Sequence, residues 1–248
     1  MISAPEALLI AAAGVLSGIV GSAGGITSLI SYPALLALGI PAFPANVANI
    51  VAVAACGPGA ALASRPELEG TASFFRRWGW VTAAGGAAGA VLLLGTPPGA
   101  FGRVVPYLVA AGSVVLILQP WLSARRGHDG QARTPVLAAG LLPVSAYSGY
   151  FGAGSGVMAL SLMLLTVEPH LPRANALKNV LVGTASVASA VVFIVFGPVD
   201  WAAAVPLGTG MFAGSLIGPR LARRIPASVL RWLVALLGLS LAVKLWMA

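Results

Sequence analysis

Residues 18–25 read GIVGSAGG and residues 149–156 read GYFGAGSG, so one glycine pattern, Gly-x-x-Gly-x-x-x-Gly, occurs twice in the chain. The two copies lie 131 positions apart, and apolar residues flank both of them. The corresponding glycines are Gly18 and Gly149, Gly21 and Gly152, and Gly25 and Gly156. A pattern repeated at this distance indicates that the chain of 248 residues consists of two similar halves.

The composition indicates a membrane protein. Hydrophobic residues make up 58% of the chain and charged residues only 8%, whereas a soluble domain carries roughly 25% charged residues. The apolar stretches are long and repeated, which is typical of helices that cross a bilayer. We therefore predict an all-α, polytopic helical membrane protein that is surrounded by lipid.

The net charge of +8 does not indicate a nucleic-acid partner. No basic run is interleaved with aromatic residues, and the arginines lie in short gaps between apolar segments. Lys and Arg are enriched in the cytoplasmic loops of membrane proteins, which accounts for the excess. The single cysteine, Cys56, excludes an internal disulfide or a cysteine metal cluster.

Apolar segments divide the chain into two sets of five. The ten predicted segments are about 6–21, 25–39, 45–63, 74–95, 103–122, 135–150, 156–168, 174–196, 201–219 and 227–247. The polar stretch 123–134 lies between the fifth and the sixth. We therefore predict a first repeat over residues 1–122, a cytoplasmic linker over 123–134, and a second repeat over 135–248.

The positions of the arginines predict the orientation. If the N-terminus lies outside and each segment reverses the chain, eleven of the twelve arginines fall inside, and only Arg103 falls outside. This places both termini outside the cytoplasmic membrane. Because five is an odd number, the second half enters the bilayer from the opposite side. Two inverted-topology repeats are typical of secondary transporters, and a pseudo-two-fold axis in the membrane plane would relate the two glycine motifs.

The first two segments of each half are short. Segment 25–39 has 15 residues, about 22 Å of helix against a hydrocarbon core of ~30 Å. Two arrangements stay open: a re-entrant or broken pair that folds back at the glycine motif, and two short spanning helices. Both give the same orientation.

The glycine motifs have two explanations. Small residues allow helices to pack closely in membranes. Alternatively, a helix begins at Gly24 and Gly25, and another begins at Ser155 and Gly156, so that free N–H groups at positive helix ends bind an anion. Ser22 and Ser155 would then cap these ends or add hydroxyl donors.

Polar residues inside the apolar segments are costly and usually functional. Asn46 and Asn49 lie one helical turn apart in the first half, and Asn175, Lys178 and Asn179 share a helix face in the second. Lys178 either extends to the headgroups or faces the bundle interior and attracts an anion. The asparagines either donate hydrogen bonds to the oxygens of that anion or join helices to each other.

Sequence motifs of the large enzyme classes do not appear. The chain has no Gly-x-Ser-x-Gly, no Walker A sequence and no Ser/His/Asp set, and its two histidines lie far apart. We therefore expect neither an enzyme nor an ATP-driven pump, and neither a cofactor nor a bound metal.

The motifs resemble those of the TauE/SafE family of membrane permeases, which is named for sulfite and organosulfonate export. In the first half the resemblance rests on the first glycine run, YPALLALGIP and ANVAN, and in the second on SGYFGAGSG, ANALKNVLVGTAS and GPVDWAAA. It also covers the closing GSLIGPRLARRIP and extends over essentially the whole chain. The resemblance implies a multi-pass permease of the cytoplasmic membrane, built from two inverted halves, that transports small sulfur-containing anions in at least some members.

These observations together favour a secondary transporter for a small anion, such as sulfite or an organosulfonate, that works by alternating access. The coupling ion, a proton or sodium, and the oligomeric state are left open by the sequence. The alternative is a membrane accessory or assembly protein that transports nothing. Transport requires a polar cavity at the glycine motifs that Lys178 or the asparagines reach, whereas an accessory role predicts a dry, sealed interface there.

Overall fold

The computed structural model describes residues 2–124 and 134–222, together with residues 232, 236, 239, 240, 243 and 246. Every regular element in this part of the chain is a helix, which confirms the all-α prediction. The first half contains α1 (Ala4–Gly24), α2 (Ser28–Ala37), α3 (Ala42–Val53), α4 (Cys56–Ala63), α5 (Arg65–Leu68), α6 (Ala72–Leu94) and α7 (Pro98–Ala124). The second half contains α8 (Thr134–Tyr150), α9 (Ser155–Thr166), α10 (Leu171–Phe196) and α11 (Trp201–Ala222).

The predicted apolar segments match these helices closely. One difference is that the third segment is split, because Ala54 and Ala55 separate α3 from α4. The last predicted segment, 227–247, lies mostly outside the described residues. The start of α1 is fixed by a capping box, in which the N–H of Ser3 donates to the Glu6 carboxylate at 2.7 Å.

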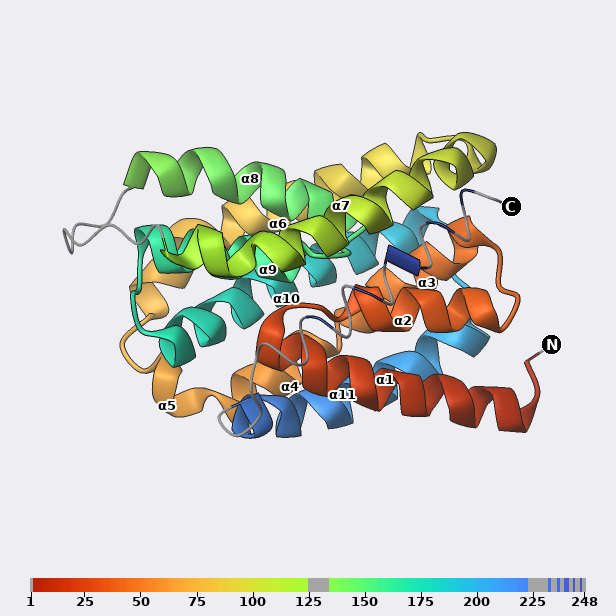
Figure 1. The fold of residues 1–248 in the computed structure, drawn as a ribbon, viewed down its shortest axis with the longest axis horizontal. Helices are drawn as coiled ribbons and strands as arrows, with labels where there is room; N and C mark the ends of the chain where they lie inside the picture. Colours follow the sequence, from red (N-terminus) through yellow and green to blue (C-terminus); the bar gives the residue numbers. More distant parts are fainter. Residues whose placement is uncertain are drawn as a thin grey trace.

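The first two helices of each half form a re-entrant hairpin (Figure 1). α1 runs inward from the right-hand end of the molecule and α2 returns to that end, whereas α8 enters from the left-hand end and α9 returns there. The start of α1 and the end of α2 are neighbours, since Glu6 and Leu38 line one pocket. At the opposite end, Leu137 of α8 and Leu164 of α9 lie in one apolar cluster. The structure therefore gives the re-entrant arrangement and not two short spans.

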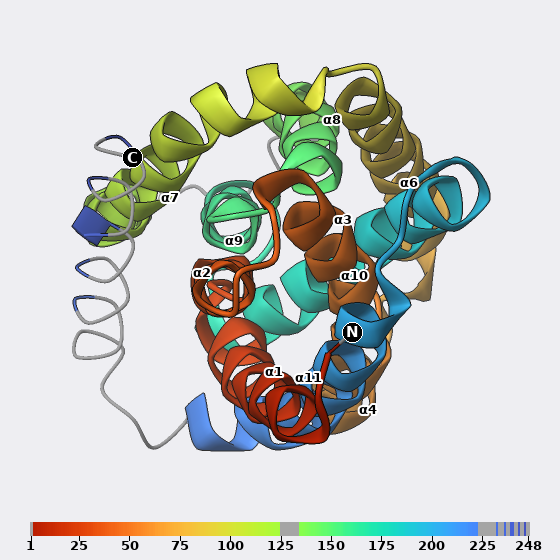
Figure 2. The same cartoon turned by 90° about the vertical axis from the view of Figure 1, so that its right-hand side faces the viewer.

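The remaining long helices connect the two ends of the molecule. Figure 2 views the bundle along its long direction, with α2, α9, α3 and α10 inside and α1, α11, α4, α6, α8 and α7 around them. By length and composition, three of the described stretches outside the hairpins are long and apolar enough to cross a membrane, Ala42–Ala63, Leu171–Phe196 and Trp201–Leu221, as is Ala4–Gly24 of the first hairpin.

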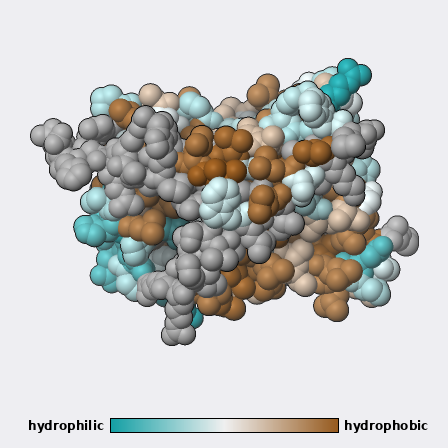
Figure 3. Space-filling model, viewed as in Figure 1, coloured by the Kyte–Doolittle hydropathy of each residue, from teal (hydrophilic) through white to brown (hydrophobic). Residues whose placement is uncertain are grey.

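The outer surface is suited to lipid. Hydrophobic residues cover much of the middle of the face in Figure 3, and hydrophilic residues gather toward its left and right ends. Large apolar side chains point outward from several helices, including Leu9, Val91 and Val195, each at least 60% exposed. Because such a surface is unfavourable in water and favourable in hydrocarbon, the protein is a multi-pass membrane protein.

Helices of the two halves pack in pairs. α1 lies along α11, and α8 lies along α6. Glycines make both approaches close: a Cβ atom on Gly14 would lie 3.1 Å from the Gly210 Cα atom, and one on Gly89 would lie 2.8 Å from the Tyr150 nitrogen. This matching of pairs agrees with two related halves of opposite direction, and the division at 1–122, 123–134 and 135–248 stays a prediction.

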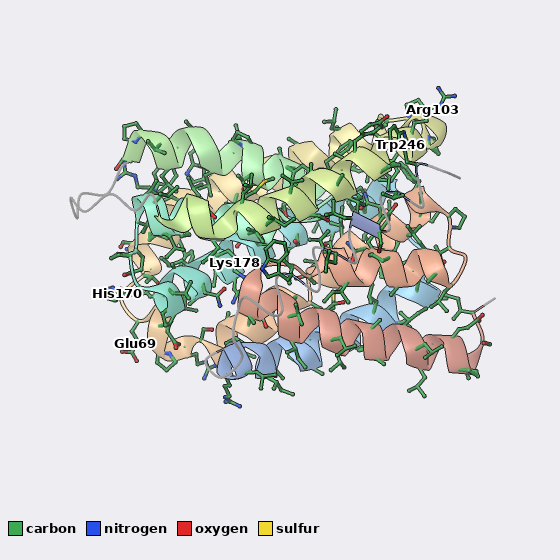
Figure 4. All side chains as sticks on the ribbon, in the orientation of Figure 1. Glu69, Arg103, His170, Lys178 and Trp246 are labelled. Carbon is green, nitrogen blue, oxygen red and sulfur yellow. The ribbon has the colours of Figure 1, made fainter. Side chains whose placement is uncertain are left out.

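Charged residues mark the two ends of the bundle. Glu69 and His170 lie at the left-hand end in Figure 4, and Arg103 lies at the right-hand end. Arg173 joins the α5 region to the start of α10, since its Nη2 atom donates to the Glu69 carbonyl oxygen at 3.4 Å. The residues that the sequence assigns to opposite sides of the membrane therefore lie at opposite ends of the molecule.

The orientation can be measured with reporter fusions. We expect alkaline phosphatase to be active when fused after Gly197 and inactive when fused after Glu69, because only the first site would lie outside the cytoplasmic membrane. A green fluorescent protein at the same two sites should give the reverse pattern. Active phosphatase at Glu69 together with inactive phosphatase at Gly197 would show that the chain is inserted the other way round.

Candidate functional site

The two glycine motifs meet at the centre of the molecule. Gly25 and Gly156 are in backbone contact: a Cβ atom on Gly156 would lie 2.5 Å from the Gly25 carbonyl oxygen. Gly25 also has a φ of 81°, the left-handed conformation that ends α1, and its N–H donates to the Gly21 carbonyl oxygen at 2.7 Å. The tips of the two hairpins therefore touch, and each needs glycine for that contact.

Four helix ends converge where the tips meet. α1 and α8 end there, and α2 and α9 begin there, as Figure 1 shows. The start of a helix carries a partial positive charge and unpaired N–H groups, whereas its end carries a partial negative charge and unpaired carbonyl groups. Both kinds of group need partners in the interior of a membrane protein.

A polar cavity of about 30 Å³ lies between the two halves at this point. We call it the central cavity. It could hold about two water molecules, since one needs roughly 10–15 Å³ of such space. Its polar lining consists of one ammonium, one amide, one thiol and several hydroxyl groups, from Lys178, Asn179, Cys56, Thr27, Ser28, Ser148, Ser155 and Ser186. Within the described part of the chain, no aspartate or glutamate lines it.

Lys178 is buried at the central cavity. Its side chain is 1% exposed, and its Nζ atom donates to the Gly21 carbonyl oxygen at 3.1 Å. Figure 4 shows it well away from both ends of the molecule. The alternative in which Lys178 extends to the lipid headgroups is therefore wrong, and Lys178 faces the interior of the bundle. Its ammonium also neutralises the negative end of α1.

The two asparagines beside Lys178 also contact the end of α1. The Nδ2 atoms of Asn175 and Asn179 both donate to the Ser22 carbonyl oxygen, at 2.8 Å and 3.0 Å. Asn179 lines the central cavity as well, whereas Asn175 does not. Asn175 and Asn179 thus give donors to the Ser22 carbonyl at the end of α1, and Lys178 adds a second donor to the Gly21 carbonyl, which also accepts from the Gly25 N–H.

The asparagines of the first half lie behind the lining of the cavity. Asn46 donates from Nδ2 to the Tyr150 carbonyl oxygen at 2.9 Å, and so caps the end of α8. Asn49 donates to the Ser28 hydroxyl at 3.0 Å and accepts from Ser31. Neither lines the central cavity. The structure therefore gives both residues the interhelical hydrogen bonds that the sequence left as one alternative.

In the first motif the second helix begins later in the chain than the sequence predicts. α1 continues to Gly24, and α2 begins at Ser28, because Gly25 ends α1 before the chain turns. Gly24 is therefore a helix end and not a helix start. Ser22 donates its hydroxyl to the Gly18 carbonyl oxygen at 2.6 Å, within α1, and does not line the cavity.

The second motif lies where the sequence predicts it. α9 begins at Ser155 after Gly154, and both Ser155 and Gly156 line the central cavity. The Ser155 hydroxyl donates to the Gly152 carbonyl oxygen at 2.8 Å. Five of the ten predicted site residues thus line the cavity, namely Gly25, Ser155, Gly156, Lys178 and Asn179.

Several lining residues were not predicted. Ser186 lies on the same face of α10 as Asn179, two turns away, and this helical spacing was the signal that could have found it. Ser28 and Thr27 could have been found only from the correct start of α2. Cys56 is buried, and nothing in the sequence indicates that it lines the cavity.

Comparisons with known proteins agree on one family. The model of the family described as "Sulfite exporter TauE/SafE" matches residues 7–245. The chain is 29% identical over 240 residues to a "Probable membrane transporter protein" of Haemophilus influenzae, which covers 94% of this chain and 91% of that protein. It is 26% identical over 243 residues to the "Probable membrane transporter protein YfcA" of Escherichia coli K12, with 93% and 86% covered. No solved structure matches the chain.

The contact between the hairpin tips can be tested with a pair of neighbouring glycines. Gly25→Ala should lower the free energy of unfolding by about 2–4 kcal/mol, because the left-handed conformation costs an alanine energy and its methyl group would meet Gly156. Gly24→Ala is the matched control, since a Cβ atom there meets nothing within 4 Å. Thermal unfolding of the two purified variants in detergent measures the difference. Equal midpoints would show that the tips do not depend on this contact.

Proposed function

The chain belongs to the sulfite exporter TauE/SafE family of membrane transporters, and on that premise we propose that it is a secondary transporter for a small anion. The anion would be a sulfur oxyanion, such as sulfite or an organosulfonate, and it would cross the cytoplasmic membrane by alternating access.

The charge of the central cavity carries the proposal. Its lining includes the Lys178 ammonium and the starts of α2 and α9, at Ser28 and Ser155, and no carboxylate among the described residues. Helix starts and an ammonium both favour an anion. The negative ends of α1 and α8 lie at the same point and offset the two positive helix starts, so the Lys178 ammonium leaves a net positive charge that favours an anion.

The donors around the cavity suit an oxyanion. An ammonium has three N–H donors, and Lys178 uses one of them on the Gly21 carbonyl oxygen. The other two can reach an anion in the cavity, together with hydroxyl groups such as those of Ser28 and Ser186. Since the cavity holds about two waters, a compact anion that replaces them would take over their hydrogen bonds.

The hairpins supply a route for alternating access. They enter from opposite ends of the bundle and meet at their tips, where Gly25 contacts Gly156 and the Tyr32 ring packs against the Phe151 ring with centroids 5.2 Å apart. Rocking of one half against the other about this contact would open the cavity first to one end and then to the other. The coupling ion, a proton or sodium, would bind in the same cycle.

Transport is tested by uptake of labelled sulfite into proteoliposomes that hold the purified protein. The same assay on a variant of Lys178 tests the role of the positive charge. Lys178→Met keeps an unbranched side chain of similar length but removes its charge, and we expect it to lower the flux at least tenfold, since a hydrogen bond to a charged group contributes about 1.5–3 kcal/mol. Arg103→Gln, at one end of the bundle, is the control and should transport normally.

The possible results separate the alternatives. Saturable flux that Lys178→Met loses supports an anion transporter with its charge at this lysine. Flux that Lys178→Met retains would leave transport in place and remove Lys178 from the binding site. If no anion moves under any imposed gradient, the accessory or assembly role becomes the better explanation.

The hydroxyl groups can be tested on α9 alone. Ser155→Ala should raise the KM for sulfite about 2–10-fold, because it removes a hydroxyl that would turn from the Gly152 carbonyl oxygen to the bound anion as a neutral donor worth about 0.5–1.5 kcal/mol. Ser161→Ala is the matched control, since Ser161 is buried on the same helix but does not line the cavity. Equal KM values for the two variants would exclude the Ser155 hydroxyl from binding.

A further inference from the structure

A second hollow lies on the other side of one wall of the central cavity. We call it the lateral groove; it has a volume of about 400 Å³. Small and apolar residues of α4, α6 and α10 line it, among them Pro58, Ala61, Ala83, Val180, Val187 and Ala188. Val187 is 46% exposed and lies in the middle part of α10, so the groove opens toward the lipid.

α10 separates the two spaces. Lys178, Val182 and Ser186 face the central cavity, whereas Val180 and Val187 face the lateral groove. α4 is divided in the same way, because Cys56 and Ala60 lie on the cavity side and Pro58 and Ala61 on the groove side. The polar site and the apolar surface are therefore the two faces of one thin partition.

Among the described residues, two line both spaces, and both are glycines. Gly57 of α4 and Gly183 of α10 appear in the cavity and in the groove. They are in direct contact, since a Cβ atom on either would lie 2.7 Å from the Cα atom of the other. We call this pair the glycine wall. No side chain fills the partition at this point, so a small separation of α4 from α10 joins the groove to the cavity.

The helix on one side of the wall is already interrupted. Ala54 and Ala55 keep helical dihedral angles, but the Ala55 N–H donates to the Ala52 carbonyl oxygen three residues earlier, so an irregular turn directly precedes α4, which has 8 residues. Its counterpart in the second half, α10, is continuous over 26 residues. α4 can therefore tilt at this irregular turn, and it contacts α10 directly at the glycine wall.

We propose that the site takes organic anions that carry an aliphatic tail, with the anionic head in the central cavity at Lys178 and the tail in the lateral groove. The tail passes between α4 and α10 where the glycine wall separates. This inference rests on the proposed function and extends it to amphiphilic substrates that exchange directly with the bilayer. The substrate needs an anionic head and an aliphatic tail because the central cavity carries a charged lysine, the lateral groove is apolar, and the two spaces adjoin at the glycine wall.

Binding can be measured without transport, on the full chain in lipid nanodiscs. The probes are methane-, butane- and octanesulfonate, and the readout is the concentration that gives half of the maximal rise in unfolding temperature. Burying one methylene group strengthens binding about fourfold. We therefore expect octanesulfonate to act at a concentration about a hundredfold or more below that of butanesulfonate.

Two tryptophan variants separate the groove from general binding to lipid. Ala188→Trp fills the lateral groove and should reduce the advantage of octanesulfonate over butanesulfonate to less than about tenfold. Val191→Trp lies on the same helix, at a position that is 56% exposed and outside the groove, and should retain the full advantage.

Octyltrimethylammonium has the same tail with a positive head and should not stabilise the protein. Lys178→Met should weaken the stabilisation by octanesulfonate.

Each alternative result has one meaning. The inference is overturned if Ala188→Trp and Val191→Trp show the same dependence on chain length, or if octyltrimethylammonium stabilises the protein as well as octanesulfonate does. It is also overturned if Lys178→Met binds octanesulfonate normally. Sulfite flux in proteoliposomes without dependence on chain length removes the tail site and leaves the proposed function intact. A tail site without any anion flux keeps the binding assignment and removes the transport function.

Discussion

The central constraint on this structure is that a bilayer offers no water to the ends of a broken helix. The hairpins end and restart helices in the middle of the molecule, so carbonyl groups of α1 and α8 lack partners along their own helices. α10 satisfies the end of α1 through Lys178 and two asparagines, and α3 satisfies the end of α8 through Asn46. The cavity, the contact of the hairpin tips and the charge at the centre all follow from these caps.

The fold could be predicted largely from the sequence, because membrane helices are decided by composition and length. The ranges of nearly all described helices and the position of the second hairpin tip followed from that reasoning. The break between α3 and α4 was not drawn as a boundary, although Pro58 is a sequence signal for it: a proline has no N–H to donate to the carbonyl oxygen of Ala54, four residues earlier, and its ring crowds that carbonyl. The end of α1 was also missed, because a glycine run does not show which glycine adopts the left-handed conformation.

The candidate site was predicted less completely. Residue type alone identified Lys178 and Asn179, since charged and amide groups in apolar helices are rare. The same argument selected Asn46, Asn49 and Asn175, which bond to other helices and do not line the cavity. A polar group that caps a helix and one that binds a ligand have the same signature in sequence. The two roles can be distinguished only by knowing which atom accepts each hydrogen bond. For most of these residues the acceptor lies in the other half of the chain.

Capping across the halves also has a consequence in time. The Lys178 ammonium and the Gly21 carbonyl oxygen are 157 positions apart in the chain. At about 5–20 residues per second, the ribosome needs roughly 10–30 s to add the stretch between them. During that interval the first hairpin has been made but its last carbonyls have no partner from α10. The newly made hairpin must therefore wait at the translocon or near the water interface, and it reaches its final depth only when α10 has been made.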